Sequence, residues 1–122
     1  MLIRDGWSSA SSFELDREGL DIAEFDGKFD VFDDEAAIKS VFYQQAIDHV
    51  KKRTGAKRVV VFDHTVRRRL PDDLKQQTES SRPAVLLVHS DYTPSSGVQR
   101  VKDILPGEAE ELLKGRVAFY NV

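Results

Sequence analysis

His89 and Asp91 are the residues of this chain whose types and spacing best suit chemistry. They follow an apolar run, residues 84–88, that is typical of a buried strand, and they open a turn that reaches Gly97. Because strand side chains alternate with a period of two, an imidazole and a carboxylate two residues apart point to the same side. Such a pair supplies two of the three protein ligands of a 2-His-1-carboxylate iron site. No convincing third ligand follows before Val122.

The same spacing also suits a structural role. A histidine at a strand end can hydrogen-bond an aspartate of the following turn, and His-x-Asp is short enough to arise by chance in many proteins. By the pattern alone this structural interpretation is the commoner one, so the case for a metal depends on the surrounding residues.

Four neighbouring side chains are candidates for binding a substrate or co-substrate. Tyr92 and Thr93 flank the ligand pair and can hydrogen-bond a bound acid. Arg67 follows a predicted buried strand directly, and Arg100 either faces the site or pairs with Asp103. Arginine suits this task because its planar donors match the oxygens of a carboxylate.

Residues 67–69, three successive arginines, also suggest a binding module for an anion or a nucleic acid. For Arg68 and Arg69 a solvated charge run is the favoured interpretation. No aromatic residues interleave with the run, and the net charge of -3 gives no general attraction to nucleic acid. We therefore expect no nucleic-acid partner.

Asp63 and His64 form a second acid-histidine pair. Adjacent residues of a regular strand point to opposite faces, so the two cannot serve one metal. His64 is a candidate general base or a partner of a metal ligand, but a buried, hydrogen-bonded histidine is the favoured interpretation.

Composition sets broad limits on the protein. Its 122 residues suffice for one domain, and 40% hydrophobic with 32% charged residues describes a globular chain. The absence of cysteine excludes disulfides, iron-sulfur clusters, zinc-cysteine sites and a thiol nucleophile. No run approaches the roughly 20 apolar residues of a membrane helix, and residues 1–7 lack a signal-peptide core. We therefore expect a cytoplasmic protein without a membrane partner.

The hydrophobic pattern predicts an α+β fold with a mostly antiparallel sheet and one long helix packed on it. The long helix spans about 34–53, with Asp33 or Asp34 as N-cap and Gly55 as its stop. A long exposed loop covers 67–81. The remaining predicted elements are a hairpin over 13–16 and 20–25, strands over 58–66, 84–89 and 116–122, and short helices over 98–105 and from Pro106.

Three stretches together resemble a known family: 59–67, then 88–93 with 97–101, then 105–116; the closing Asn121-Val122 is similar to the start of its Asn-Val-Trp-Arg-Pro motif. The family is that of hydroxylase/desaturase-like oxidoreductases of secondary metabolism, which includes the cephalosporin methoxylase small subunit and fungal meroterpenoid iron(II)/2-oxoglutarate oxygenases. The resemblance implies a jelly-roll (double-stranded β-helix) core, iron(II) and 2-oxoglutarate as cofactors, and hydroxylation or desaturation of a small organic metabolite.

By the same resemblance His89 and Asp91 match the first two iron ligands of the family. The second histidine and the arginine that anchors 2-oxoglutarate belong to the family's C-terminal half, and nothing here matches them. The chain therefore resembles only the N-terminal part of one oxygenase domain. Three alternatives follow. The sequence is a fragment of a longer protein, or a complementing chain or a second copy supplies the missing strands, or the chain has lost the reaction and is a non-catalytic partner subunit or binding module on the same scaffold.

Overall fold

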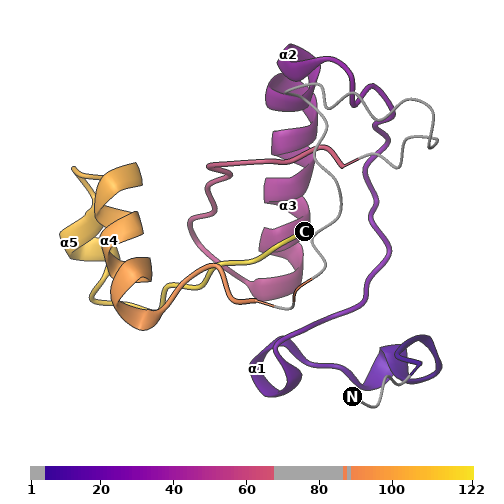
Figure 1. Ribbon diagram of the computed structural model, residues 1–122, viewed down its shortest axis with the longest axis horizontal. Coiled ribbons are helices and arrows are strands. Elements are labelled where there is room, and N and C mark those ends of the chain that lie inside the picture. The colour runs from indigo at the N-terminus through magenta and orange to yellow at the C-terminus, as the bar shows by residue number, and fades with distance from the viewer. Residues whose placement is uncertain (1–4, 68–86, 88) are drawn as a thin grey trace.

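One long helical column is the main element of the computed structural model, which describes residues 5–67, 87 and 89–122. It is built from α2 (Glu35–Ala37), a π-helical turn η2 (Ile38–Phe42) and α3 (Tyr43–Thr54), which follow one another without a break (Figure 1). The helix predicted over 34–53 is thus confirmed. Its signals are local, since apolar residues recur at helical spacing and both ends carry capping residues.

The caps of this column are those that the sequence predicts. The Asp34 carboxylate accepts hydrogen bonds from the backbone N–H groups of Ala36 and Ala37, at 2.9 and 3.0 Å. At the other end Gly55 adopts a left-handed conformation with φ of 69°, and its N–H donates to the Lys51 carbonyl. Both ends therefore satisfy backbone groups that a helix leaves without internal partners.

A second helical unit consists of α4 (Pro94–Ile104) and α5 (Ala109–Leu112), which pack on each other at one side of the long column (Figure 1). The predicted helix over 98–105 is confirmed, but it starts four residues earlier, at Pro94. Thr93 caps it, and Ser96 completes a capping box. The stretch that the sequence predicts to be a turn, from Tyr92 to Gly97, instead contains the start of α4, because proline suits the first helical position.

The predicted hairpin over 13–25 is wrong. The N-terminal region holds a 3-10 turn, η1 (Trp7–Ser12), and a single helical turn, α1 (Leu15–Glu18). Gly19 ends α1 with φ of 75°, and no strand follows in 20–25. The apolar-acidic alternation of four residues is too short to decide between a strand and a helical turn.

The predicted sheet is also wrong for the residues that the structure describes. They contain no strand, only an isolated bridge at Arg67, so neither an antiparallel sheet nor part of a jelly-roll is formed there. The stretches 58–66 and 116–122 run without a ladder partner. A strand is defined by pairing, so β-branched residues without a neighbouring strand stay unpaired coil. Most of the predicted strand 84–89 and of the loop 67–81, including Arg68 and Arg69, lies outside the described residues.

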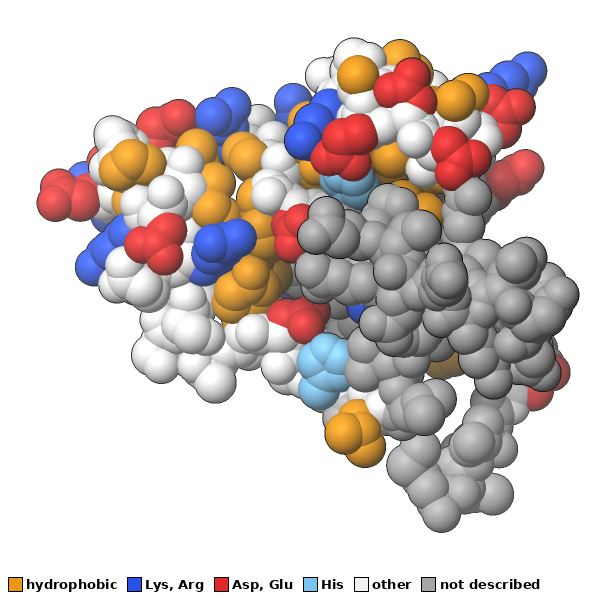
Figure 2. All heavy atoms as spheres, turned by 45° about the horizontal axis from the view of Figure 1, so that its top comes forward, with side chains coloured by type: hydrophobic (Ala, Val, Ile, Leu, Met, Phe, Trp, Pro, Cys, Tyr) orange, Lys and Arg blue, Asp and Glu red, His pale blue; other side chains and the backbone are white. Residues whose placement is uncertain are grey.

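The buried core of the described part is small. Only Ile38, Ala46, Val101 and Ala109 are both hydrophobic and buried there. The chain exposes 10525 Å², against about 6600 Å² for a compact monomer of this mass. Figure 2 shows hydrophobic side chains reaching the surface between charged ones. Much apolar surface is therefore left uncovered by the chain itself.

Ion pairs tie distant segments to the two helical units. Arg53 on α3 holds Asp21 at 2.5 Å, and Arg58 reaches Glu108 before α5 at 3.1 Å. The Arg58–Glu108 pair is about half exposed and contributes little stability. The Asp21 side chain is only 15% exposed, so the Arg53–Asp21 pair is the better shielded of the two. No helix among the described residues is long and apolar enough to cross a membrane.

Candidate functional site

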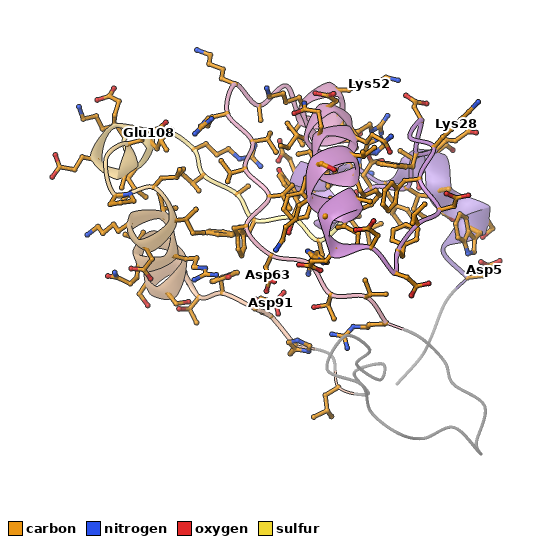
Figure 3. The ribbon with its side chains drawn as sticks, turned by 90° about the horizontal axis from the view of Figure 1, so that it is seen from above. Asp5, Lys28, Lys52, Asp63, Asp91 and Glu108 are labelled. Atoms are coloured by element: carbon orange, nitrogen blue, oxygen red, sulfur yellow. The ribbon has the colours of Figure 1, made fainter. Side chains whose placement is uncertain are left out.

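An open cleft of about 580 Å³ lies between the start of α4 and the C-terminal stretch. It gathers four of the six candidate site residues: His89, Asp91, Tyr92 and Thr93. Figure 3 shows Asp91 on the stretch that leads into α4. The cleft has an apolar wall, formed mainly by Phe62, Val98, Val101, Leu113 and Phe119. Its polar end is formed mainly by His89, Asp91, Thr93 and Asn121.

His89 and Asp91 face each other at the polar end. Nε2 of His89 lies 3.3 Å from Oδ1 of Asp91, and both side chains are about half exposed. The other ring nitrogen, Nδ1, lies 3.0 Å from the carbonyl oxygen of Leu87. A carbonyl only accepts, so Nδ1 carries the proton and donates it to this bond.

This arrangement has an electrostatic consequence. In the neutral imidazole Nε2 is then an acceptor, and it is directed at a carboxylate oxygen, which also only accepts. Two acceptor atoms repel each other at this separation unless a positive charge lies between them. Here that charge would be either a proton on Nε2 or a metal cation. The pair is thus an imidazolium-carboxylate ion pair or a set of two metal donors.

The distance suits an ion pair, and it suits a shared metal as well. Two donors that bind one metal at about 2.1 Å and about 90° apart are separated by about 3.0 Å, close to the observed 3.3 Å. The bond to Leu87 resembles the second contact that usually fixes the tautomer of a metal-binding histidine. His89 and Asp91 therefore fit a divalent metal as two of its ligands. No group of three or more His, Cys, Asp or Glu residues suited to a metal occurs within 5–67, 87 and 89–122.

Asn121 is a site residue that sequence reasoning did not single out. Its amide Nδ2 donates to Oδ2 of Asp91 at 3.1 Å, across 30 positions of sequence. The only sequence signal is its place in the Asn-Val motif, since no spacing rule relates residue 121 to residue 91.

Aromatic side chains form the wall beside this polar end. Tyr92 stacks on Phe119 with ring centroids 4.4 Å apart, and Phe62 meets both rings edge-on, at 6.3 and 6.0 Å. Each such pair contributes about 0.5–1.5 kcal/mol beyond its buried area. Tyr92, which the sequence proposes as a binding residue, thus lines the cleft mainly as part of this aromatic cluster.

The other predicted binding residues are placed differently. The Thr93 hydroxyl is engaged in capping α4, where it accepts from the Ser96 N–H at 3.2 Å. Arg100 does not line the cleft. Its guanidinium lies over the Phe62 ring, 5.0 Å from the centroid, and its buried Nε has no hydrogen-bond partner among the described residues. Arg67 is exposed and also lies away from the cleft lining.

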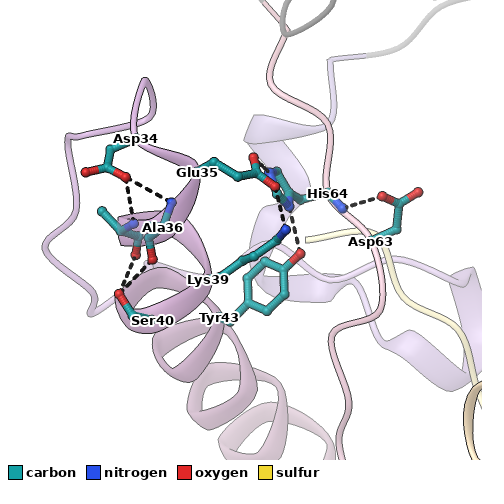
Figure 4. Close-up of polar contacts among 9 residues, drawn as sticks. Asp34, Glu35, Ala36, Lys39, Ser40, Tyr43, Asp63 and His64 are labelled. Atoms are coloured by element: carbon teal, nitrogen blue, oxygen red, sulfur yellow. Dashed lines mark hydrogen bonds and ion pairs between the residues drawn. The ribbon is translucent and has the colours of Figure 1, made fainter.

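His64 belongs to a separate hydrogen-bonded network on the long helical column (Figure 4). Its Nδ1 lies 2.7 Å from the Tyr43 hydroxyl and its Nε2 lies 3.0 Å from a Glu35 oxygen. Both ring nitrogens are engaged and the side chain is 21% exposed. The favoured structural role of His64 agrees with this geometry, and the network attaches the stretch before Arg67 to the helix.

Charge and burial shift two pKa values in this network. The hydrogen bond from Lys39, with a smaller contribution from His64, lowers the pKa of Glu35 below its ordinary 4.5. Burial raises the pKa of the Tyr43 hydroxyl above 10. Tyr43 therefore stays a neutral hydrogen-bonding group beside His64 at ordinary pH.

Comparison with known proteins identifies the class. Over residues 1–122 the chain matches the family described as oxidoreductase/YMDC permease-like domain, and it belongs to that family. The oxidoreductase relationship that the three sequence motifs predict is confirmed. No solved structure matches the chain significantly.

Curated relatives narrow the relationship. The chain is 32% identical to "Oxidoreductase AN1597" of Emericella nidulans, over 100% of its own length and 43% of the relative's. It is 26% identical to "Hydroxylase/desaturase efuI" of Hormonema carpetanum, over 99% of the chain and 44% of that relative. It is also 26% identical to "Alpha-ketoglutarate-dependent dioxygenase phiK" of a fungal species (strain ATCC 74256), over 98% of the chain and 44% of that relative. The chain thus spans less than half the length of the relatives it matches.

Proposed function

We propose that this chain carries part of the active site of an iron(II)/2-oxoglutarate-dependent oxygenase that hydroxylates or desaturates a small organic metabolite. The observation that carries the proposal is the His89–Asp91 pair, with Nε2 and Oδ1 3.3 Å apart and Nδ1 bonded to the Leu87 carbonyl. The relative named as an alpha-ketoglutarate-dependent dioxygenase supports the choice of co-substrate.

The chain's own residues have distinct tasks in this proposal. His89 supplies a neutral nitrogen donor whose tautomer is fixed by the bond to Leu87. Asp91 supplies the negative charge that iron(II) favours in an oxygen ligand. The wall of Phe62, Tyr92 and Phe119 excludes water from one side of the pair and offers apolar contact to a substrate. When bound, iron(II) and 2-oxoglutarate would supply the chemistry that activates dioxygen for oxidation of the substrate.

The proposal includes a contribution from outside the described residues. A third ligand is not found among them, and the chain corresponds to only 43–44% of each relative. We propose that a further polypeptide segment, in a longer form of this sequence, a complementing chain or a second copy, supplies the third ligand. The large exposed surface supports this, since apolar side chains such as Val117 and Tyr120 beside the cleft are exposed.

The test is localised metal binding. Mn²⁺ serves as a redox-stable substitute for iron(II), and its paramagnetism broadens the NMR signals of nearby nuclei. We expect broadening centred on His89 and Asp91, lost in His89→Gln and in Asp91→Ala. The matched controls are His49→Gln and Asp30→Ala, which change the same residue types away from the cleft.

A second arm tests the co-substrate. 2-Oxoglutarate should tighten Mn²⁺ binding, because a ligand that chelates the bound metal is coupled to it reciprocally. Glutarate lacks the keto oxygen and should have no such effect. If broadening is absent from His89 and Asp91, the oxygenase proposal is wrong, and the alternative of a non-catalytic partner subunit or binding module takes its place.

A further inference from the structure

Asn121 is the one side chain among the described residues whose polar atom is bonded to the carboxylate of the His89–Asp91 pair from another segment. The bond joins Nδ2 of Asn121 to Oδ2 of Asp91 at 3.1 Å, while the other oxygen, Oδ1, is the one that faces His89. The two carboxylate oxygens are thus in different environments.

A second contact fixes the segment that bears Asn121. Phe119, two residues earlier, stacks on Tyr92, the residue after Asp91, with an interplanar angle of 26°. Residue 92 meets residue 119 and residue 91 meets residue 121, so the two stretches run side by side in opposite directions (Figure 1). The stack holds the C-terminal stretch where the Asn121 amide reaches Asp91.

The chemistry of the donor also matters. A neutral amide N–H can bond a carboxylate oxygen without cancelling its charge, whereas a lysine or arginine would compete with a metal for that charge. An occupied Oδ2 leaves Oδ1 as the oxygen available on the His89 side. The Asp91 carboxylate is therefore oriented to bind a metal through one oxygen and not through both.

We propose that Asn121 is a positioning residue that holds Asp91 as a single-oxygen donor turned toward His89. This inference rests on the proposed function, because it assigns a role within the same metal site. The proposed function concerns whether a metal binds at this site. The present inference concerns which oxygen of Asp91 binds it.

The experiment compares Mn²⁺ and Ca²⁺ binding by the wild-type chain, Asn121→Leu and Val122→Ala. Leucine keeps the approximate shape of asparagine without a donor, and Val122 is a neighbouring exposed side chain that serves as control. We expect Asn121→Leu to weaken Mn²⁺ binding about 10-fold or more, the usual effect of losing a contact to a metal ligand. Val122→Ala should bind as the wild type does.

Selectivity separates positioning from a general structural loss. A carboxylate released from Asn121 can chelate with both oxygens, a mode that Ca²⁺ accepts readily. Asn121→Leu should therefore lower the Mn²⁺/Ca²⁺ affinity ratio, whereas local unfolding would weaken both ions alike. An unchanged ratio overturns the positioning role.

A metal-free readout completes the test. In the wild-type chain the side-chain amide protons of Asn121 should give nuclear Overhauser effects to the β protons of Asp91. If the wild type binds Mn²⁺ at His89 and Asp91 but Asn121→Leu binds equally well, the inference fails and the proposed function stands. If the wild type binds no Mn²⁺, the proposed function fails, and the Overhauser effects alone decide whether Asn121 orients Asp91.

Discussion

Tyr43→Phe should loosen the attachment of the His64 segment to the long helical column. The change removes the hydroxyl that lies 2.7 Å from His64 Nδ1 and leaves the ring in place. A hydrogen bond of this kind contributes about 1 kcal/mol net, which corresponds to roughly a fivefold change in the opening equilibrium. The remaining bond from His64 to Glu35, at 3.0 Å, is exposed and holds the segment only in part.

Modification by diethylpyrocarbonate measures this opening. The reagent attacks a ring nitrogen of histidine, and both nitrogens of His64 are engaged until the segment opens. We expect His64 to react about fivefold faster in Tyr43→Phe, quantified by peptide mass spectrometry. His89, whose side chain is 54% exposed, provides an internal standard in the same sample.

The matched control is Tyr120→Phe, which removes the hydroxyl of an exposed tyrosine that makes no hydrogen bond to the His64 ring. It should leave the rate at His64 unchanged. The reasoning is refuted if the two variants behave alike, or if His64 in the wild type already reacts as fast as His89.

Three further perturbations test other parts of the fold. Asp34→Ala removes the acceptor of two N-terminal N–H groups and should cost about 1 kcal/mol, seen as lower helix content by circular dichroism and a lower unfolding midpoint. Gly97→Leu should displace Phe119, because a Cβ there already lies 3.2 Å from its ring; Overhauser effects between Tyr92 and Phe119 should be lost. The pKa of Glu35 is lowered on folding, so its stabilising contribution is present above about pH 4.5 and is lost as the pH falls through the lower folded-state value; Glu35→Gln should reduce the loss of thermal stability between about pH 6 and about pH 3.

Each of these changes has a counterpart. Asp30→Ala alters an exposed carboxylate outside the helix cap and should leave helix content unchanged. Gly107→Leu places its side chain where no atom lies within 4 Å of the new Cβ, so the Tyr92–Phe119 contacts should persist. Lys39→Gln removes the main cause of the lowered Glu35 pKa and should reproduce part of the Glu35→Gln effect. For the first two pairs, equal effects of a variant and its counterpart would contradict the assigned contact. For the third pair, a Lys39→Gln variant that loses as much thermal stability as the wild type would contradict it.

Local signals predict the helices well. The long column from Glu35 to Thr54 begins at Asp34 and ends at Gly55, as the capping rules indicate. The start of α4 at Pro94 was also present in the sequence, since Thr93 and Ser96 form a capping box around the proline. These features depend on residues within one or two helical turns, so a linear pattern contains the information.

The sheet shows the opposite case. The β-branched stretch 58–66 has strand composition but no ladder partner among the described residues. Strand formation requires a second segment at hydrogen-bonding distance, and pairing is not a property of one stretch. The resemblance that predicts the jelly-roll comes from relatives more than twice as long as this chain.

For the candidate site, the sequence by itself determined the family and the His89–Asp91 pair, because both depend on residue types at short spacing. Only the tertiary structure decided that Nδ1 of His89 is bonded to Leu87 and that Asn121 holds Asp91. It also decided that Arg100 lies over the Phe62 ring and outside the cleft lining. These contacts join segments up to 38 positions apart or depend on side-chain orientation, and no pattern along the chain encodes either.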